Sequence, residues 1–488
     1  MTASPPVLAI GGARLTAGFD HYRRLDAQAH RAVHGTPRTR SLRALTALAE
    51  SVDLRGRGGA AFPFARKLAA VAESARRQDA RPVVLVNATE GEPASGKDAV
   101  LVTRAPHLVL AGAMLAADAL GSREVTIGVT AHGGRSLRTA IAQWRQTRRV
   151  RVVVLPERFV TGEGGALVRG VNGGPAIPPG RKVRAAQSGV DGRPTLLSNA
   201  ETYAQLALLA ALGRDRYAAV GTREEPGTVL LTVTTPAGRT VVETPTGVAL
   251  EEVLRLCGTG PGQAVLAGGY HGAWLGAQAA ATATVSRAGF ERAGATLGAG
   301  VIAVLPADTC PLGEVARIAA YLGAQSSGQC GPCRLGLPAI GRALGTLANG
   351  TADADTVVAI RRGADAVTGR GACHHPDGTT RFIRSALDVF ADDVARHLDL
   401  GGCHRPVRGV LPLPDDEAAP PRARLVVDWT RCSGHGLCAH LVPDLVSLDG
   451  DGYPSPASAP VPGALAADAA RAVAMCPALA LRLESQRG

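Results

Sequence analysis

The nine cysteines of this 488-residue chain are unevenly placed, and their spacing constrains the fold more than any other feature. None precedes Cys257, and eight lie beyond residue 300. Cys330 and Cys333 form a Cys-x-x-Cys pair in the stretch SSGQCGPCRLG, with Ser327 three residues before the pair. This spacing favours a metal or iron–sulfur site. The first half of the chain lacks cysteine and needs another cofactor if it takes part in redox chemistry.

The start of the chain and its apolar runs bear on location. No basic start precedes an apolar stretch, and no run of about eighteen uncharged apolar residues occurs. We therefore expect a cytoplasmic protein that meets a membrane only through a partner. In that compartment cysteines indicate metal or redox chemistry rather than disulfides.

The net charge of +12 raises the alternative of a basic nucleic-acid binder with a structural metal. The arginines are scattered, and aromatic residues make up only 3% of the chain. Single-strand binders interleave basic and stacking residues, so this composition argues against nucleic acid as a partner.

The chain is too long for one compact core, and its patterns indicate several domains of an α/β fold. Apolar runs such as PVVLVN, EVTIGV and VRVVVLP alternate with helical segments such as PHLVLAGAMLAADAL and SLRTAIAQWRQTRR, which is typical of a largely parallel sheet. The predicted parts are an α/β domain at 40–215, a β-grasp-like domain at 226–300, a helical domain at 305–403, a proline-rich linker at 404–423 and a small cysteine-containing domain at 424–488.

A glycine-rich loop, LRGRGGAAFPFARK, begins at Leu54 and runs into a long amphipathic helix. Such a loop lets backbone N–H groups approach a phosphate, and the helix N-terminus adds positive potential. Alone the motif is weak, because many such loops are simple turns. The chain uses arginine almost to the exclusion of lysine, so Lys67, Lys97 and Lys182 indicate positions that need a compact charge.

Polar residues follow the predicted strands. Asn87, Glu90 and Glu92 come at the end of the strand in VLVNATEGEP. Because α/β sheets bind ligands at the carboxyl ends of their strands, this segment predicts a binding site. In SNAET, Asn199 and Thr202 stand at a helix start, where the alternative is an ordinary N-cap.

The ordered motifs LRGRGGAAFP, NATEGEP, GEGGAL and SNAET resemble the NADH-oxidising flavoprotein subunit of respiratory complex I. Related subunits occur in NAD-linked hydrogenases and formate dehydrogenases. The resemblance covers about residues 45 to 400 and implies an FMN-binding α/β domain, a β-grasp domain and a helical bundle with one 4Fe–4S cluster. The FMN-site residues that it implies are Gly56, Arg57, Gly58, Gly59, Lys67, Asn87, Thr89, Glu90, Glu92, Gly162, Glu163, Asn199 and Thr202.

The departures from the family pattern concern the nucleotide site. Thr89 replaces an acid beside the flavin, and Gly164 replaces a second acid. Ile177 and Gly180 stand where the family has a lysine and an adenine-stacking phenylalanine. The FMN site is therefore expected to be mostly intact, whereas NAD(H) as the donor stays open.

The family's cluster motif has a cysteine where this chain has Ser327, and its other ligands correspond to Cys330, Cys333 and Cys373. The alternatives are ligation by the Ser327 oxygen, a fourth thiolate from Cys403 or Cys310, a three-iron cluster, a zinc site or an empty site. We favour an occupied site completed by Ser327 or Cys403. Ser327 as a helix cap is the ordinary alternative.

The tail resembles small single-cluster bacterial ferredoxins. Cys432 and Cys438 are separated by five residues, Cys476 is followed by Pro477, and His435 stands at the second ligand position. Three thiolates suffice for a 3Fe–4S cluster, and His435 could hold a fourth iron or face solvent.

These observations predict an oxidoreductase that passes electrons from a two-electron donor, with NADH as one candidate, through FMN to iron–sulfur clusters and an external acceptor. No side-chain acid or base is assigned to hydride transfer, and Glu92 is the residue expected nearest the flavin's reactive face. The alternative is an electron-relay module that has lost its nucleotide site and is reduced by a partner protein.

Overall fold

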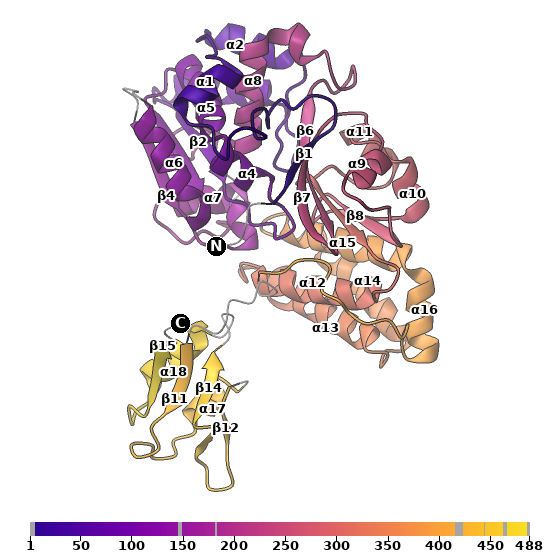
Figure 1. Ribbon diagram of the computed structural model, residues 1–488. Coiled ribbons are helices and arrows are strands. Elements are labelled where there is room, and N and C mark those ends of the chain that lie inside the picture. Colours follow the sequence, from indigo (N-terminus) through magenta and orange to yellow (C-terminus); the bar gives the residue numbers. More distant parts are fainter. Residues whose placement is uncertain are drawn as a thin grey trace. The chain divides into compact units, whose positions relative to one another are not determined.

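The computed structural model describes residues 5–144, 149–180, 183–414, 423–443, 445–461 and 466–485. The chain forms two compact units, residues 1–411 and 412–488 (Figure 1). The division falls inside the predicted linker, of which residues 415–422 lie outside the described part, as does Lys182.

A parallel sheet in the larger unit has the strand order β4-β3-β2-β5. Its strands are β2 (Val83–Ala88), β3 (Glu124–Val129), β4 (Arg149–Val154) and β5 (Thr195–Asn199), which include the three predicted apolar runs. The helices of this part are α1 (Ala27–His34), α2 (Leu42–Glu50), α3 (Phe64–Arg77), α4 (Lys97–Arg104), α5 (Pro106–Leu120), α6 (Ala131–Gln143), α7 (Gly164–Val171) and α8 (Ala200–Tyr217). The helix expected in SLRTAIAQWRQTRR begins earlier, at Ala131, and residues 145–148 lie outside the described part.

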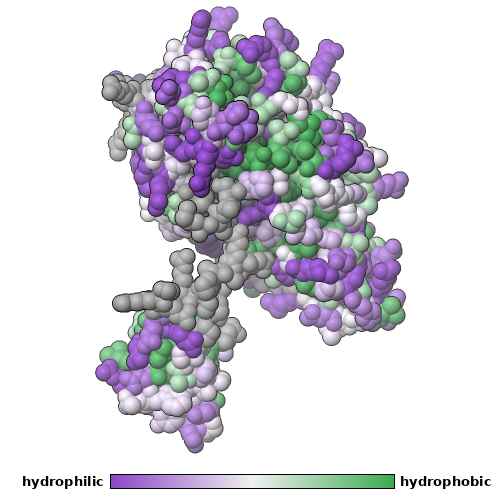
Figure 2. Space-filling view, in the orientation of Figure 1, coloured by the Kyte–Doolittle hydropathy of each residue, from purple (hydrophilic) through white to green (hydrophobic). Residues whose placement is uncertain are grey.

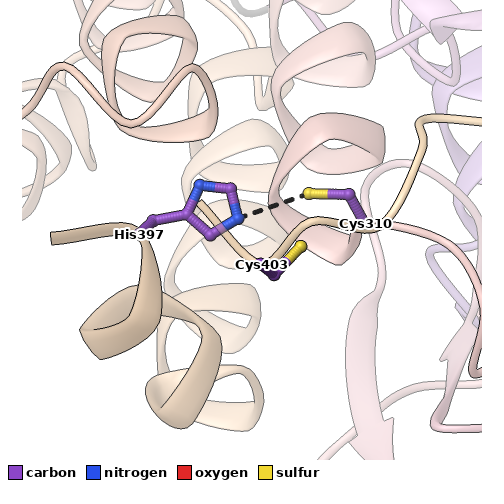
Figure 3. Close-up of side chains that lie close together, drawn as sticks. All are labelled: Cys310, His397 and Cys403. Atoms are coloured by element: carbon purple, nitrogen blue, oxygen red, sulfur yellow. Dashed lines mark hydrogen bonds between the residues drawn. The ribbon is translucent and has the colours of Figure 1, made fainter. Parts of the chain in front are cut away.

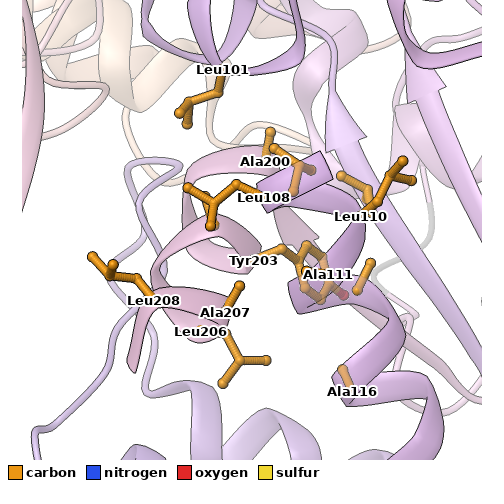
Figure 4. Close-up of a cluster of buried hydrophobic side chains, with 14 of the residues drawn as sticks. Leu101, Leu108, Leu110, Ala111, Ala116, Ala200, Tyr203, Leu206, Ala207 and Leu208 are labelled. Carbon is orange, nitrogen blue, oxygen red and sulfur yellow. The ribbon is translucent and has the colours of Figure 1, made fainter. Parts of the chain in front are cut away.

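Both faces of this sheet are covered, which explains its continuous apolar strands. Val84 and Val86 belong to the main core with α5 and α8, while Val83 and Leu85 pack with residues of α7. Figure 4 shows part of the main core, where residues of α4, α5 and α8 meet. A Cβ at Gly112 would lie 1.8 Å from the carbonyl oxygen of Tyr203, so α5 and α8 pack this closely because residue 112 is glycine.

The chain order of the strands reverses at β2. This strand pairs with β3 on one side and with β5 on the other, and Asn87 and Asn199 are partners in register. In a parallel sheet such a reversal leaves a crevice at the carboxyl ends of the strands, where ligands bind. The topology therefore places both predicted asparagines at one edge.

A second, mixed sheet has the strand order β1-β7-β6-β10-β8-β9. The antiparallel strands β6 and β7 form a hairpin within the predicted β-grasp-like domain. The sheet extends beyond the predicted range 226–300 on both sides, because β1 pairs with β7 and the buried run of β10 pairs with β6. Its elements are β1 (Val7–Ala9), β6 (Thr228–Thr235), β7 (Gly238–Pro245), α9 (Leu250–Leu256), β8 (Ala264–Ala267), β9 (Ala273–Gly276), α10 (Ala277–Thr282), α11 (Arg287–Arg292) and β10 (Val301–Leu305).

The rest of the larger unit is helical. A π-helical turn at Pro332–Gly336 interrupts the run between its first two helices, and such turns often mark functional sites. The helices are α12 (Pro311–Gln325), α13 (Leu337–Ala348), α14 (Ala354–Val367), α15 (His375–Val389) and α16 (Ala391–Leu400).

The smaller unit is built on the antiparallel sheet β14-β11-β15. Its apolar core includes Leu425, Val446 and Leu481, and the cysteines of the tail pack against it. The elements are β11 (Ala423–Val427), α17 (Leu437–Leu441), β12 (Ser447–Leu448), β13 (Pro454–Ser455), β14 (Ser458–Val461), α18 (Ala466–Met475) and β15 (Leu481–Ser485).

Among the described residues, no single helix is long and apolar enough to cross a membrane, although α4 and α5 pass that test as a pair bent by 93°. Figure 2 shows hydrophilic residues over most of the visible face of the larger unit, with apolar residues gathered near its centre.

Candidate functional site

The glycine-rich loop is closed by a 3.0 Å hydrogen bond from Gly56 N to Phe62 O. Gly59 has a φ of +97°, a conformation that favours glycine. A Cβ at Gly58 would lie 3.5 Å from Cβ of Asn199, so the missing side chain lets the loop approach the end of β5. Among the described residues no side chain caps α3. Phe64 N donates to the carbonyl oxygen of Leu54 at 2.8 Å, so the N–H groups of the first turn that an anion can use are those after Phe64.

The end of β5 is tied to this loop. Asn199 caps α8, because its Oδ1 accepts a hydrogen bond from Thr202 N at 3.3 Å, so the N-cap alternative is confirmed for this residue. Its Nδ2 donates to Asp98 Oδ2 at 3.1 Å. Arg57 N donates to Thr202 Oγ1 at 2.9 Å, which fixes the loop to the start of α8.

Asn87, at the end of β2, holds two loops together. Its Nδ2 donates to the carbonyl oxygen of Gly162 at 2.9 Å. Its Oδ1 accepts hydrogen bonds from Thr89 N at 3.1 Å and Thr89 Oγ1 at 2.7 Å. The buried Thr89 thus fills a position beside this amide, and both residues shape the crevice by fixing the backbone around it.

Two of the predicted carboxylates cap helices. Glu90 accepts hydrogen bonds from Asp98 N at 3.1 Å and Ala99 N at 2.8 Å at the start of α4. Burial, together with the nearby carboxylate of Asp98, raises the pKa of Glu90. Glu163 accepts from Ala166 N at 2.8 Å at the start of α7 and also lines a large cavity. Glu90 therefore holds the connection between β2 and α4 in place, whereas Glu163 also faces a cavity that a ligand can fill.

That cavity has a volume of about 1020 Å³, at the upper end of the range for small-molecule sites. Lys67 lines it and donates from Nζ to the carbonyl oxygen of Leu197 at 3.1 Å, and burial lowers the pKa of this lysine. Phe62 lines it too and is 42% exposed. The walls come from the glycine-rich loop, α3, the turn before α7 and β5, with Ala60, Phe62, Lys67, Glu163, Gly164 and Leu197 among the lining residues.

Two of the positions that depart from the family pattern, Gly164 and Gly180, border open space, whereas Thr89 is buried. The nearest described atom to a Cβ at Gly164 would be Leu197 Cδ1 at 4.0 Å, and a Cβ at Gly180 would meet no described atom within 4 Å. The intervening loop is held by a 2.7 Å hydrogen bond from Gln329 Nε2 to the carbonyl oxygen of Pro178. Because Gln329 precedes Cys330, this bond links the cavity loop directly to the first cysteine motif.

Glu92 and Lys97 do not line the large cavity, and Lys97 instead borders a smaller cavity of about 190 Å³ with Gly56, Arg57 and Gly59 of the glycine-rich loop. Glu92 accepts hydrogen bonds from Tyr270 N at 2.7 Å and Ala94 N at 3.3 Å, and burial raises its pKa to about 7 despite these donors. Lys97 is 3% exposed and lies 2.9 Å from Glu201 Oε2. Burial alone would lower the pKa of Lys97, but Asp98, Glu201 and Glu90 raise it. Glu92 bonds to the loop between β8 and β9, and Glu201, the partner of Lys97, accepts a hydrogen bond from Leu230 N of β6 at 3.1 Å, so these carboxylates join the parallel-sheet part to the second sheet.

Cys330, Cys333 and Cys373 lie beside one another at the end of α12. Burial, reinforced by the other two thiols, raises the pKa of Cys333 to about 12. Burial also acts on Cys330, but hydrogen bonds from the backbone N–H groups of Ala372 and Cys333 lower its pKa. Adjacent thiols with backbone N–H donors are suited to hold an iron–sulfur cluster.

A serine hydroxyl does reach this group, but from the neighbour of the predicted ligand. Ser326, the C-cap residue of α12, donates a hydrogen bond to the sulfur of Cys333. Ser327 follows it and is half-buried. The two serines before the cysteine motif, Ser326 and Ser327, are thus part of the site. Ligation by Ser327 stays a prediction.

The geometry excludes Cys310 and Cys403 as the fourth ligand. Cys310 caps the N-terminus of α12, whereas Ser326 and Cys333 meet at its C-terminus. A helix of 15 residues separates them by about 22 Å. The sulfur of Cys403 lies within 4.8 Å of that of Cys310, at the same distant end. Cys403, one of the two favoured ligands, and Cys310, a further alternative, flank the helical domain in sequence, and packing places both elsewhere.

The sequence analysis missed two histidines, His271 and His375. They lie between Phe159, in the turn before α7, and Cys373. Nε2 of His375 bonds to the carbonyl oxygen of Leu322 at 2.8 Å, so this nitrogen carries the proton and Nδ1 accepts from His271 Nε2 at 3.0 Å. Burial lowers the pKa of both rings. The ring of Phe159 lies 4.7 Å from that of His271. The adjacent histidines in ACHHPD, His374 and His375, were the available signal for His375, and His271 has no such signal.

In the smaller unit, the four predicted tail ligands line one small cavity: Cys432, His435, Cys438 and Cys476. Gly434 and Gly436 have φ values of +68° and +72°, which turns the loop around this space. Ala480 N donates to Cys476 Sγ at 3.4 Å. The structure therefore brings together residues that are separated by up to forty-four positions in the sequence.

Three segments of the chain match known protein families. Residues 49–208 match the Nuo51 FMN-binding domain. Residues 314–397 match the NADH-ubiquinone oxidoreductase-F iron-sulfur binding region, and residues 425–483 match the 4Fe-4S single cluster domain. The three segments follow the order of the cavity and the two thiol sites along the chain.

Whole-chain relatives agree with these segments. The chain is 25% identical over 378 residues to an NADH-quinone oxidoreductase subunit of Rhizobium meliloti (strain 1021), covering 73% of this chain and 89% of the relative. It is 24% identical to the NADP-reducing hydrogenase subunit HndC of Solidesulfovibrio fructosivorans, covering 81% and 82%. A crystal structure of NAD+-reducing [NiFe]-hydrogenase in the H2-reduced state superposes with a TM-score of 0.70 at 26% identity, covering 81% of this chain and 68% of that chain.

Proposed function

We propose that this chain, a relative of NADH-quinone oxidoreductase subunits and of NAD(P)-linked hydrogenase subunits, is an oxidoreductase that binds FMN and two iron–sulfur clusters. The observation that carries the proposal is the convergence of the end of the glycine-rich loop at Ala60 and Phe62, Lys67 and the turn at Glu163–Gly165 on one cavity, which β5 also lines. FMN, when bound, exchanges two electrons with a donor and single electrons with a cluster.

The residues of the crevice fit a phosphate-bearing ligand. The first turn of α3 after Phe64 and the N–H groups of Gly58 and Gly59 offer donors to the phosphate, whereas Gly56 N and Arg57 N already hold the loop in place. Lys67 adds a positive charge. Because residue 58 is glycine, the loop can lie close to Asn199, and a larger side chain at this position would have to share that space. Asn87, Asn199 and Thr202 hold the loops in place rather than offering free donors.

The two thiol groups fit the two clusters. In the larger unit Cys330, Cys333 and Cys373 would hold a 4Fe–4S cluster, with a serine oxygen at the fourth position. In the smaller unit Cys432, Cys438 and Cys476 would hold a 3Fe–4S cluster, or a 4Fe–4S cluster if His435 binds the fourth iron. The relatives are named as subunits, and we infer that a partner protein takes or supplies the electrons.

We infer that the donor is NAD(P)H and that its affinity is weakened. Phe62 is exposed beside the cavity, and the positions of Gly164 and Gly180 leave room that a nucleotide can enter. The same two glycines remove an acid and an aromatic ring that the family pattern supplies. The relay alternative shares every cofactor, so only the donor distinguishes the two functions.

The test is a set of anaerobic absorption spectra of the purified full chain, reconstituted with clusters and FMN. NADH and then NADPH are added, and we expect the flavin to bleach and the clusters to be reduced. Bound flavin that stays oxidised with both nucleotides, yet bleaches with dithionite, would contradict the donor and leave the relay. A chain that retains no FMN would contradict the site itself.

Matched variants locate the site. Lys67→Met should weaken FMN binding by at least about tenfold, since it removes a charged contact to the phosphate. Arg77→Met, a change on the same helix, should leave the affinity unchanged. The variants Gly164→Glu and Gly180→Phe restore the family's residues in open space and should lower the KM for NADH severalfold.

A further inference from the structure

Three side chains outside the two cluster sites form a compact group at the far end of α12. The sulfurs of Cys310 and Cys403 and a ring nitrogen of His397 all lie within 4.8 Å of one another (Figure 3). Cys310 and His397 are 3% and 2% exposed, and Cys403 is half-buried. The flavin and cluster sites use none of these residues.

The group is assembled from three elements. Cys310 caps α12 and accepts a hydrogen bond from Gly313 N at 3.3 Å. His397 lies in the last turn of α16, and Cys403 follows that helix. The spacing H-x5-C is a local signal for a pair of ligands, but the contribution of Cys310, eighty-seven residues before His397, depends on packing.

The imidazole of His397 is oriented for coordination. Its Nδ1 lies 3.0 Å from the carbonyl oxygen of Leu347, so Nδ1 carries the proton. The lone pair of Nε2 therefore points toward the sulfur of Cys310, at 3.5 Å. A carbonyl that fixes the tautomer of a histidine in this way is the usual outer support of a metal ligand.

The distances fit a single ion. With Zn–S bonds of about 2.3 Å and Zn–N bonds of about 2.0 Å in a tetrahedron, a sulfur and a nitrogen ligand lie roughly 3.5 Å apart. The observed separation of Cys310 Sγ and His397 Nε2 is 3.5 Å. An iron–sulfur cluster inserts its own core between its ligands, whereas these three atoms all lie within 4.8 Å of one another.

The scaffold around the group is held by further contacts. Pro406 O accepts hydrogen bonds from Cys310 N at 2.9 Å and Thr309 Oγ1 at 3.0 Å. The fully buried Glu314 accepts from Arg408 N at 3.0 Å and Gly409 N at 2.6 Å. The segment after Cys403 is thus bound at two points to the start of α12, through Pro406 and through Arg408 and Gly409.

We propose that Cys310, His397 and Cys403 bind one Zn²⁺ ion that fastens the segment after α16 to the start of α12. The ion takes the place of the two thiol protons, which pass to solvent, and His397 binds through its free Nε2. A water molecule takes the fourth position of the tetrahedron, on the half-buried side of Cys403.

The test is metal analysis of the full chain after incubation with Zn²⁺ and removal of the excess. We expect close to one zinc per chain, and X-ray absorption at the zinc edge should show two sulfur ligands and one nitrogen ligand from the protein. Cys403→Ser should lower zinc retention at least about tenfold without changing iron content. Cys257→Ser, a change at another half-buried cysteine, should keep the zinc.

Three results would overturn the site. The wild-type chain could retain no zinc, which needs no variant to fold. The zinc could instead be lost from Cys333→Ser and kept by Cys403→Ser, which would place it at the cluster thiols. Peptide mass analysis of protein purified without oxidants could show a Cys310–Cys403 disulfide. None of these results depends on FMN or NAD(P)H, so the zinc site and the proposed function fail separately.

Discussion

The larger and the smaller unit each gather three cysteines around a fourth position that is not cysteine, and they do so by different means. In the larger unit Cys333 lies in a π-helical turn, Cys330 lies two residues before that turn, and Cys373 lies in the loop before α15. Ser326 reaches these thiols from the end of α12. In the smaller unit Cys432, His435 and Cys438 stand on one loop that glycines turn around a cavity.

The difference lies in what positions the ligands. In the larger unit several packed helices must meet, and burial acts on the thiols, as the raised pKa of Cys333 shows. In the smaller unit most of the site is local in sequence, and only Cys476 comes from a distant helix end. A chain can therefore retain a three-thiol site on either scaffold while its fourth position changes.

The largest expected effect comes from removing one thiol at each site. Cys333→Ser should lose the cluster of the larger unit, and Cys438→Ser that of the smaller unit, at a cost of about three to four irons per chain in each case. Iron analysis with electron paramagnetic resonance of the reduced protein measures this. Cys257→Ser is the control that should keep all iron. Full iron retention in Cys333→Ser would show that Cys333 does not hold a cluster in the larger unit.

The fourth positions should respond in opposite directions when a thiolate is restored. His435→Cys replaces a neutral ring by a negative ligand, which stabilises the oxidised cluster and should lower its midpoint potential, on the order of 100 mV. Ser327→Cys replaces a harder oxygen donor by sulfur and should raise the potential of the other cluster. Redox titration of each variant followed by electron paramagnetic resonance checks both signs.

A matched change refines this prediction. Ser326→Ala removes the hydrogen bond to Cys333 and should lower the potential of the same cluster by a smaller amount. An unchanged potential in Ser327→Cys would exclude Ser327 as a ligand, and a large shift in Ser326→Ala would transfer that role to its neighbour.

The larger unit should also carry a pH dependence through Glu92. Burial raises the pKa of this group from 4.5 to about 7, so the folded state binds a proton more tightly than the unfolded state. The protonated form supports folding fully below about pH 4.5, and this contribution is lost as pH rises to about 7, by roughly 1–3 kcal/mol. Denaturant unfolding at several pH values should show Glu92→Gln gaining on the wild type across this range. Parallel pH profiles of the two proteins would contradict this role of Glu92.

The smallest expected effect is a difference in thiol reactivity in the iron-free protein. Hydrogen bonds from backbone N–H groups lower the pKa of Cys330 against its burial, while burial raises the pKa of Cys333 and Cys438. Because the thiolate is the nucleophile, Cys330 should react with iodoacetamide severalfold faster than the other two near neutral pH. Peptide mass analysis over time gives the order, and faster labelling of Cys438 would reverse the contrast.

Local structure followed closely from sequence where one pattern had a single physical solution. The run EVTIGV forms β3 at Glu124–Val129, because continuous apolar β-branched residues fit a strand covered on both faces. The run PHLVLAGAMLAADAL forms α5 between Pro106 and Gly121, a proline at its start and a left-handed glycine after its end. The buried run of β10 lay outside the predicted β-grasp range, because a short apolar run does not reveal its partner.

The candidate site was only partly readable in the same way. The glycine-rich loop and Lys67 were recognised from their chemistry, and both border the cavity. The roles of Glu90 as a helix cap and of Lys97 as a buried ion-pair partner were not, because each depends on groups supplied by another element. The same motif residues can bind a ligand or hold the loop that does, and the sequence does not separate the two.

By itself the sequence determined the elements, the order of the three family-matching segments and the spacing of each cysteine motif, since these depend on neighbours within a few residues. Only the tertiary structure decided that Asn87 and Asn199 meet at one edge, that Ser326 contacts Cys333, and that Cys310 joins His397 and Cys403. Such meetings join residues from separate elements, and they are set by how apolar faces pack and not by local pattern.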